Sequence, residues 1–97
     1  MLQALVQQYE EKIVRAVDLR EKIDLMNSLA WQLRIRDPER ARVFALDAYK
    51  QSQLPEEDPY KLGSAASLIV LSFLDGEAGK LDTAMSRSLE ALSCIQD

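Results

Sequence analysis

Helix-breaking residues are scarce in this chain, and their positions divide it into regular segments. Only three glycines and three prolines occur in 97 residues. Asp37-Pro38 and Asp58-Pro59 each place a capping carboxylate before a proline, which is favourable at the first position of a helix. Asp18 with Glu21 resembles a capping box, and Gly79 fits the carboxyl end of a helix or a turn. These signals predict helices over 3–17, 19–35, 38–53, 59–77 and 81–96.

The apolar residues of every segment recur at three- and four-residue intervals, as on one face of a helix. In the last segment this stripe comprises Leu81, Met85, Leu92 and Ile95, and we expect the fourth segment to cover most of it. No segment alternates with the period of a strand. The sequence therefore predicts an all-α fold of about five helices, with neighbours antiparallel across short connections.

A packing pattern occurs twice along the chain. Leu29-Ala30-Trp31 is echoed by Leu71-Ser72-Phe73, and each triplet is followed by small residues spaced four and then three apart. The first of these small sets is Ala41, Ala45 and Ala48, and the second is Ala84, Ser88 and Ala91. Small side chains let two antiparallel helices approach closely, so we expect each triplet helix to be clasped by the helix that follows it.

With Leu33, Gly79 and Leu81, these residues resemble the tetratricopeptide repeat (TPR), a helix–turn–helix unit of α-solenoids. The resemblance implies one TPR-like domain over 1–97, with an extra amino-terminal helix (1–18) and repeats at 19–53 and 59–97. The copies are 42 residues apart, from Ala30 to Ser72, whereas the family repeats at about 34. Asp75 stands where the family has a large aromatic residue.

TPR proteins bind peptides or partner helices in a groove lined by the first helix of each repeat. By this resemblance, the candidate groove residues are Asp24, Asn27, Trp31, Arg34, Ile69 and Phe73. Trp31 and Phe73 would be apolar anchors, while Asn27 and Arg34 would hold the backbone or a carboxylate of the partner. The alternative is that both aromatic residues simply belong to the core.

The end of the chain suggests a second surface. A short solenoid normally needs a polar capping helix, yet the last segment carries Leu89 and Cys94 beside its apolar stripe. Leu89, Leu92 and Cys94 are therefore the candidate residues of an end face. This face could join two copies as a homodimer, or continue into a longer array.

Composition disfavours several other functions. There is no histidine and only one cysteine, so we expect neither an enzyme nor a bound metal or cofactor. Residues 51–97 hold 3 basic against 8 acidic side chains, so we expect no nucleic-acid binding, although Arg34, Arg36, Arg40 and Arg42 cluster around a turn. No apolar run approaches the ~20 residues of a membrane span, and the first residues lack a secretory signal, which favours a cytoplasmic location.

We therefore expect a non-catalytic protein-interaction module that binds a protein or peptide. The Asp37–Ala41 run after a Leu-Ala-Trp helix also resembles repeat arrays at the amino ends of bacterial signalling proteins. That resemblance implies a regulatory or sensory segment of a larger signal-transduction protein. The rival hypothesis is a self-assembly module.

Overall fold

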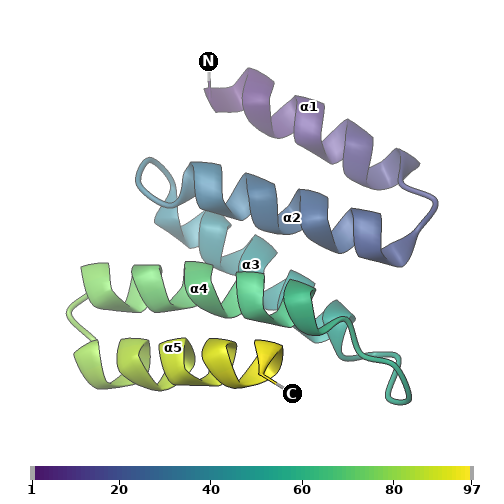
Figure 1. The fold of residues 1–97 in the computed structure, drawn as a ribbon. Helices are drawn as coiled ribbons and strands as arrows, with labels where there is room; N and C mark the ends of the chain where they lie inside the picture. The colour runs from purple at the N-terminus through teal and green to yellow at the C-terminus, as the bar shows by residue number, and fades with distance from the viewer. Residues whose placement is uncertain (1, 97) are drawn as a thin grey trace.

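The computed structural model describes residues 2–96, and these form five α-helices without any strand (Figure 1). The helices are α1 (Leu2–Arg15), α2 (Leu19–Leu33), α3 (Pro38–Ser52), α4 (Lys61–Glu77) and α5 (Leu81–Ile95). The predicted all-α class is confirmed, and each predicted boundary lies within two residues of the observed one.

Three of the predicted helix boundaries have the expected local chemistry. The Asp18 carboxylate accepts a hydrogen bond from the Arg20 backbone N–H, and the Asp37 carboxylate accepts one from Arg40. Gly79 has a φ of 81°, which only glycine adopts readily, and the Lys80 N–H after it donates to the Asp75 carbonyl at 2.8 Å. Capping carboxylates therefore set where α2 and α3 begin, and the backbone conformation of Gly79 sets where α4 ends.

The prediction that Asp58 caps the fourth helix is wrong. Helix α4 begins two residues after Pro59, and the Asp58 carboxylate instead pairs with Arg20 at 3.3 Å. Tyr60 holds the chain in a non-helical conformation because its N–H donates to the Ser52 carbonyl and its hydroxyl donates to Asp24. Contacts with α2 and α3 thus outweigh the local preference of Asp-Pro.

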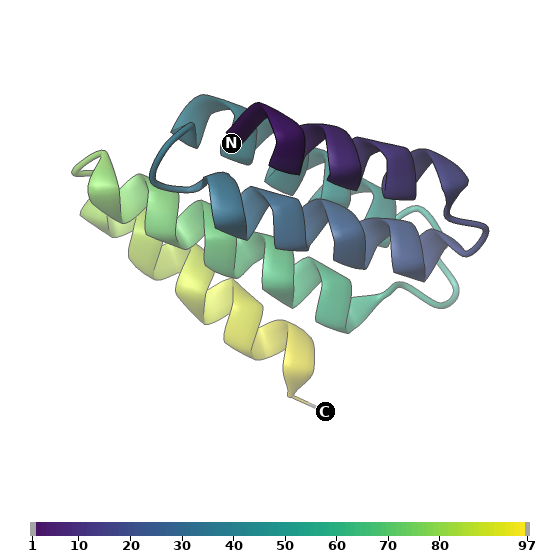
Figure 2. The same ribbon diagram turned by 90° about the horizontal axis from the view of Figure 1, so that it is seen from above.

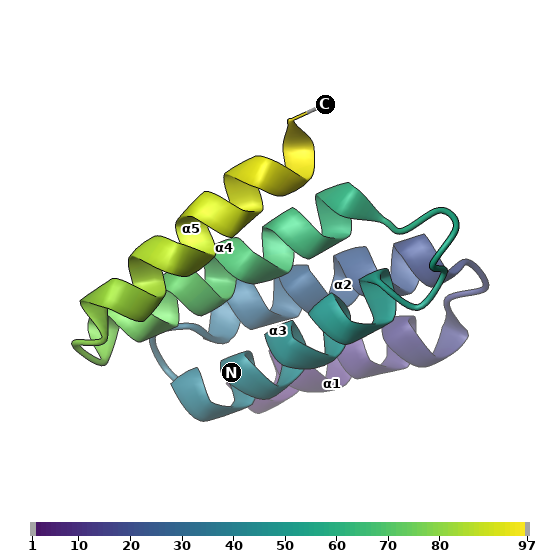
Figure 3. The ribbon, with the colours of Figure 1, turned by 90° about the horizontal axis from the view of Figure 1, so that it is seen from below.

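The helices stack as two antiparallel hairpins, α2 with α3 and α4 with α5, with α1 packed against α2 (Figure 1). Viewed from above, α2 and α4 lie side by side (Figure 2), and α3 packs against both of them. The view from below shows α5 crossing α4 at the far end of the stack (Figure 3). The molecule is a slab of 35 × 34 × 15 Å, so its terminal helices each have a broad uncovered side.

The repeated small residues pack as predicted. Ala30, Ala41 and Ala45 are completely buried in the main core, which α1 to α4 share. In the second hairpin the Ser72 hydroxyl donates to the Ala84 carbonyl at 2.7 Å and contacts the Ser88 hydroxyl at 2.6 Å. Both Leu-small-aromatic turns are therefore clasped by the following helix.

The expectation that α4 covers the apolar stripe of α5 is wrong. Leu81, Met85, Leu92 and Ile95 remain 49–70% exposed, and Ala91 is the buried residue of the helix. Helix α4 packs on the small side chains because they allow the two backbones to approach closely, and this rotates the larger side chains outward.

Candidate functional site

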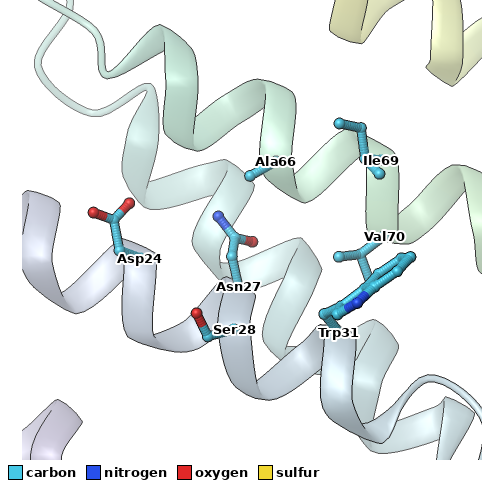
Figure 4. A pocket seen from close by; sticks show the side chains of 7 residues that line it. All are labelled: Asp24, Asn27, Ser28, Trp31, Ala66, Ile69 and Val70. Carbon is cyan, nitrogen blue, oxygen red and sulfur yellow. The ribbon is translucent and has the colours of Figure 1, made fainter.

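Two hollows flank Trp31 on the face where α2 and α4 run side by side. The first, of about 410 Å³, lies between these two helices (Figure 4) and is lined by Asp24, Asn27, Ser28, Trp31, Ala66, Ile69 and Val70. The second, also about 410 Å³, lies between α4 and α5. Trp31 and Ile69 line both hollows. We call the two hollows and the ridge between them the groove.

Trp31 is held in place but not buried. Its ring packs edge-on against Phe73, with centroids 5.8 Å apart, and 41% of the residue stays exposed. The Arg34 guanidinium lies 3.7 Å from the centroid of the indole and 5.3 Å from that of Phe73. An Nη1 hydrogen bond of 2.7 Å to the Trp31 carbonyl fixes Arg34 in turn. The indole is therefore preorganised, with one part available to a partner.

Arg34 makes more contacts within the chain than the sequence suggested. Its charge is stacked on two rings, an arrangement that stabilises the aromatic pair. Its Nε atom is buried and makes no hydrogen bond to residues 2–96. Arg34 thus holds the Trp31 and Phe73 rings in place and keeps one donor without an acceptor in the described part of the chain.

Asn27 has a structural role that differs from the predicted one. Its side-chain amide donates to the Gly63 carbonyl at 3.1 Å, and its oxygen accepts from the Ser67 hydroxyl at 2.8 Å. The residue is only 6% exposed. Asn27 therefore ties α2 to α4 beneath the first hollow, where a partner's backbone cannot readily reach it.

The close approach of α2 and α4 depends on Gly63. A Cβ at this position would lie 2.5 Å from Cδ2 of Tyr60 and 2.9 Å from Cγ2 of Ile23. Tyr60 is fixed there because its hydroxyl donates to the Asp24 carboxylate at 2.7 Å. This hydrogen bond, with burial as a lesser cause, raises the pKa of Tyr60 above its ordinary 10.0. Asp24 itself stays exposed at the mouth of the first hollow.

Ile69 and Phe73 stand on α4 as expected from the resemblance. Ile69 is 53% exposed between the two hollows, and Phe73 is half-buried beside the indole. Leu92 and Ile95 of α5 also line the second hollow. Their contribution to the groove was not predicted, because both residues belong to the apolar stripe that α4 was expected to cover.

Asp75 is a second residue whose role the sequence did not predict. It is 2% exposed, and its two carboxylate oxygens bind Arg42 of α3 at 3.0 Å and Arg87 of α5 at 2.6 Å. An acidic residue inside the most apolar helix was the signal that could have revealed it. This carboxylate links three helices, and one of its partners, Arg42, belongs to the arginine cluster around the α2–α3 turn.

The three residues of the predicted end face differ in their exposure. Leu89 and Leu92 are 61% and 49% exposed, but Cys94 packs against a cluster containing Leu68 and Ala91. Burial, and to a lesser extent the charge of Glu90, raises the pKa of the Cys94 thiol. Cys94 therefore belongs to the α4–α5 contact rather than to the surface beyond it.

No family model matches the chain, and no curated protein or solved structure was found to match it. Within residues 2–96, no helix is both long and apolar enough to cross a membrane. The same residues contain no group of three histidine, cysteine or acidic side chains placed to hold a metal ion. The groove is therefore the feature of the molecule that indicates a function.

Proposed function

We propose that this chain is a non-catalytic protein-interaction module of TPR type, which binds an apolar peptide or helix of a partner protein in the groove. The observation that carries the proposal is the state of Trp31. Its indole is fixed by Phe73 and Arg34, yet two-fifths of the residue is exposed between two hollows. Rigid, half-exposed aromatic residues of this kind are typical anchors of protein interfaces.

The shape and polarity of the groove describe its occupant. The two hollows, each of about 410 Å³, suit two large apolar side chains of the partner, one on either side of Trp31. Asp24 lies at one end of the α2 face and Arg34 lies ten residues further along it, or roughly 15 Å. An amphipathic segment with a basic group near Asp24 and an acidic group near Arg34 would complement both.

The exposed apolar surface is large enough to support binding. Covering the exposed parts of Trp31 and Ile69 removes roughly 200 Å² from water, which is about 5 kcal/mol before the costs of association. Removing one of the two side chains therefore forfeits about 2 kcal/mol, or roughly 30-fold in affinity.

The second resemblance, carried by Asp37–Ala41, extends this proposal to the setting of the module. We infer a cytoplasmic regulatory segment of a bacterial signal-transduction protein, whose groove reports the presence of a partner to an attached domain. Recovery of the complete reading frame tests this setting, since an attached kinase or cyclase domain would support it and an unrelated neighbour would contradict it.

The groove is tested by selecting binders from a displayed library of random peptides and measuring their affinity for three proteins. We expect peptides with two large apolar residues to bind the wild-type chain and to bind Ile69→Asp at least about 30-fold more weakly. Val43→Asp is the matched control, because Val43 is a similarly exposed branched residue of α3 outside the groove. Equal loss in both variants, or no loss in either, contradicts the proposal.

Trp31 supplies an independent readout because it is the only tryptophan. A selected peptide that covers the indole should shift its fluorescence emission to shorter wavelength. Trp31→Ala should weaken peptide binding strongly, whereas it should lower the melting temperature of the chain only slightly. A peptide that binds tightly without changing the emission would occupy another surface.

A further inference from the structure

Helix α5 carries an apolar surface that no other helix of residues 2–96 covers. We call it the α5 stripe, and its members Leu81, Met85, Leu89, Leu92 and Ile95 are 70%, 67%, 61%, 49% and 52% exposed. At 100° per residue, these five positions occupy an arc of about 120°. Ala91, which faces α4, lies about 100° from the centre of that arc. Ser88, whose hydroxyl contacts Ser72 of α4, lies near the Ile95 edge of the arc, so the stripe borders the α4 contact on that side.

The area of the α5 stripe is that of a small but specific interface. Its five residues expose roughly 600 Å² of surface, so two such stripes facing each other would bury at most about 1,200 Å². This value is at the lower end of the range for stable protein interfaces. A contiguous apolar patch of this size is at the upper end of what monomeric proteins expose, and such patches are often functional.

The charges around the α5 stripe favour a partner of the same kind. The stripe itself contains no ionisable side chain. Of the three charged residues of α5, Arg87 is bound to Asp75 and Glu90 to Tyr49, while Asp82 is exposed at the edge of the stripe beside Leu89. A surface without charges of its own offers nothing to attract an oppositely charged partner. It does fit an identical apolar stripe.

We propose that the α5 stripe packs antiparallel against the α5 stripe of a second copy of this chain, forming a two-fold symmetric dimer. An axis near Ser88 would bring Leu81 opposite the partner's Ile95. The antiparallel arrangement also opposes the two helix dipoles. Because Leu92 and Ile95 line the second hollow as well, the dimer and a peptide in the groove would compete for that hollow.

Sedimentation velocity on the 97-residue chain tests the dimer without any groove ligand. Between about 1 and about 500 μM we expect a monomer–dimer equilibrium, as suits an interface of this area. Leu89→Glu places one carboxylate from each copy in the interface and should weaken dimerisation at least about tenfold. Val43→Glu, at an equally exposed site on α3, should leave it unchanged. A chain that stays monomeric, or a dimer that Leu89→Glu does not weaken, overturns the proposal.

Salt and cross-linking test the partner's identity and orientation. Each copy has a net charge of −4, so added salt should screen the repulsion and tighten the dimer, whereas weakening by salt would contradict an apolar interface.

In a Cys94→Ser background, Leu81→Cys with Ile95→Cys should give disulfides that join position 81 to position 95 between chains. These positions are about 21 Å apart along one helix, too far for a bond within a chain. Bonds joining like positions would refute the antiparallel arrangement. A monomeric result would overturn only this dimer and leave the groove proposal standing.

Discussion

Removing the Asp75 carboxylate is the perturbation whose consequence the structure defines best. Asp75 is 2% exposed in α4 and joins Arg42 at 3.0 Å to Arg87 at 2.6 Å. Asp75→Leu would leave two guanidinium groups beside an apolar side chain. At their present positions, both arginines would then lack the carboxylate that accepts their hydrogen bonds.

The magnitude follows from the burial of the three partners. Breaking a fully buried ion pair destabilises a protein by about 3–5 kcal/mol. The Arg42 and Arg87 side chains are 33% and 27% exposed, so each can turn partly toward water and recover some solvation. We therefore expect Asp75→Leu to lower the free energy of unfolding by about 2–3 kcal/mol, and the melting temperature by about 10–20 °C.

Urea denaturation followed by circular dichroism measures this loss directly. Glu77→Gln is the matched control, since Glu77 is exposed two residues further along α4, and it should change stability by less than about 0.5 kcal/mol. Adding Arg42→Met and Arg87→Met to Asp75→Leu should restore most of the loss, because no unpaired charge then remains. A loss below about 0.5 kcal/mol in Asp75→Leu alone would refute the reasoning.

Three further predictions concern helix contact and titration. Gly63→Ala should destabilise the chain by about 2 kcal/mol, because the new methyl group meets the Tyr60 ring. Gly76→Ala is the control and should stabilise the chain slightly, because a Cβ there meets nothing within 4 Å. Equal effects of the two substitutions in urea denaturation would contradict the contact with Tyr60. The pKa of Tyr60 is raised in the folded state, so the unfolded chain loses this proton first as pH rises. The free energy of unfolding should therefore fall as pH rises above 10.0. Tyr60→Phe should reduce this dependence of the free energy of unfolding on pH, as measured by denaturation curves. Burial raises the pKa of Cys94, so a thiol reagent at about pH 8 should label the folded chain more slowly than the unfolded one, and equal rates would place the thiol in solvent.

The helices were predictable because their boundaries depend on local chemistry. Asp18, Asp37 and Gly79 act through backbone groups only two to five residues away, and such interactions can be read from the sequence. The small-residue notches were predictable for a similar reason, since Ala30 and Ser72 precede their partners at nearly equal spacing.

The misses concern interactions between distant residues. Tyr60 displaces the start of α4 because it binds Ser52 and Asp24, and neither partner is implied by the Asp-Pro pair. Asn27 became a structural tie because Gly63 admits α2 closely enough for its amide to reach the α4 backbone. Periodicity identified the apolar stripe of α5 correctly, but it could not show which side of that helix α4 would cover.

Trp31 and Ile69, between the two hollows, form the proposed preformed binding surface of the groove. Titration of the isotope-labelled chain with a selected peptide, followed by nuclear magnetic resonance, tests it most directly, because the single indole N–H gives one resolved signal. We predict that the Trp31 indole and Ile69 methyl signals shift together while the Val43 methyl signals stay in place. Shifts centred on Val43 with an unmoved indole signal would contradict the account.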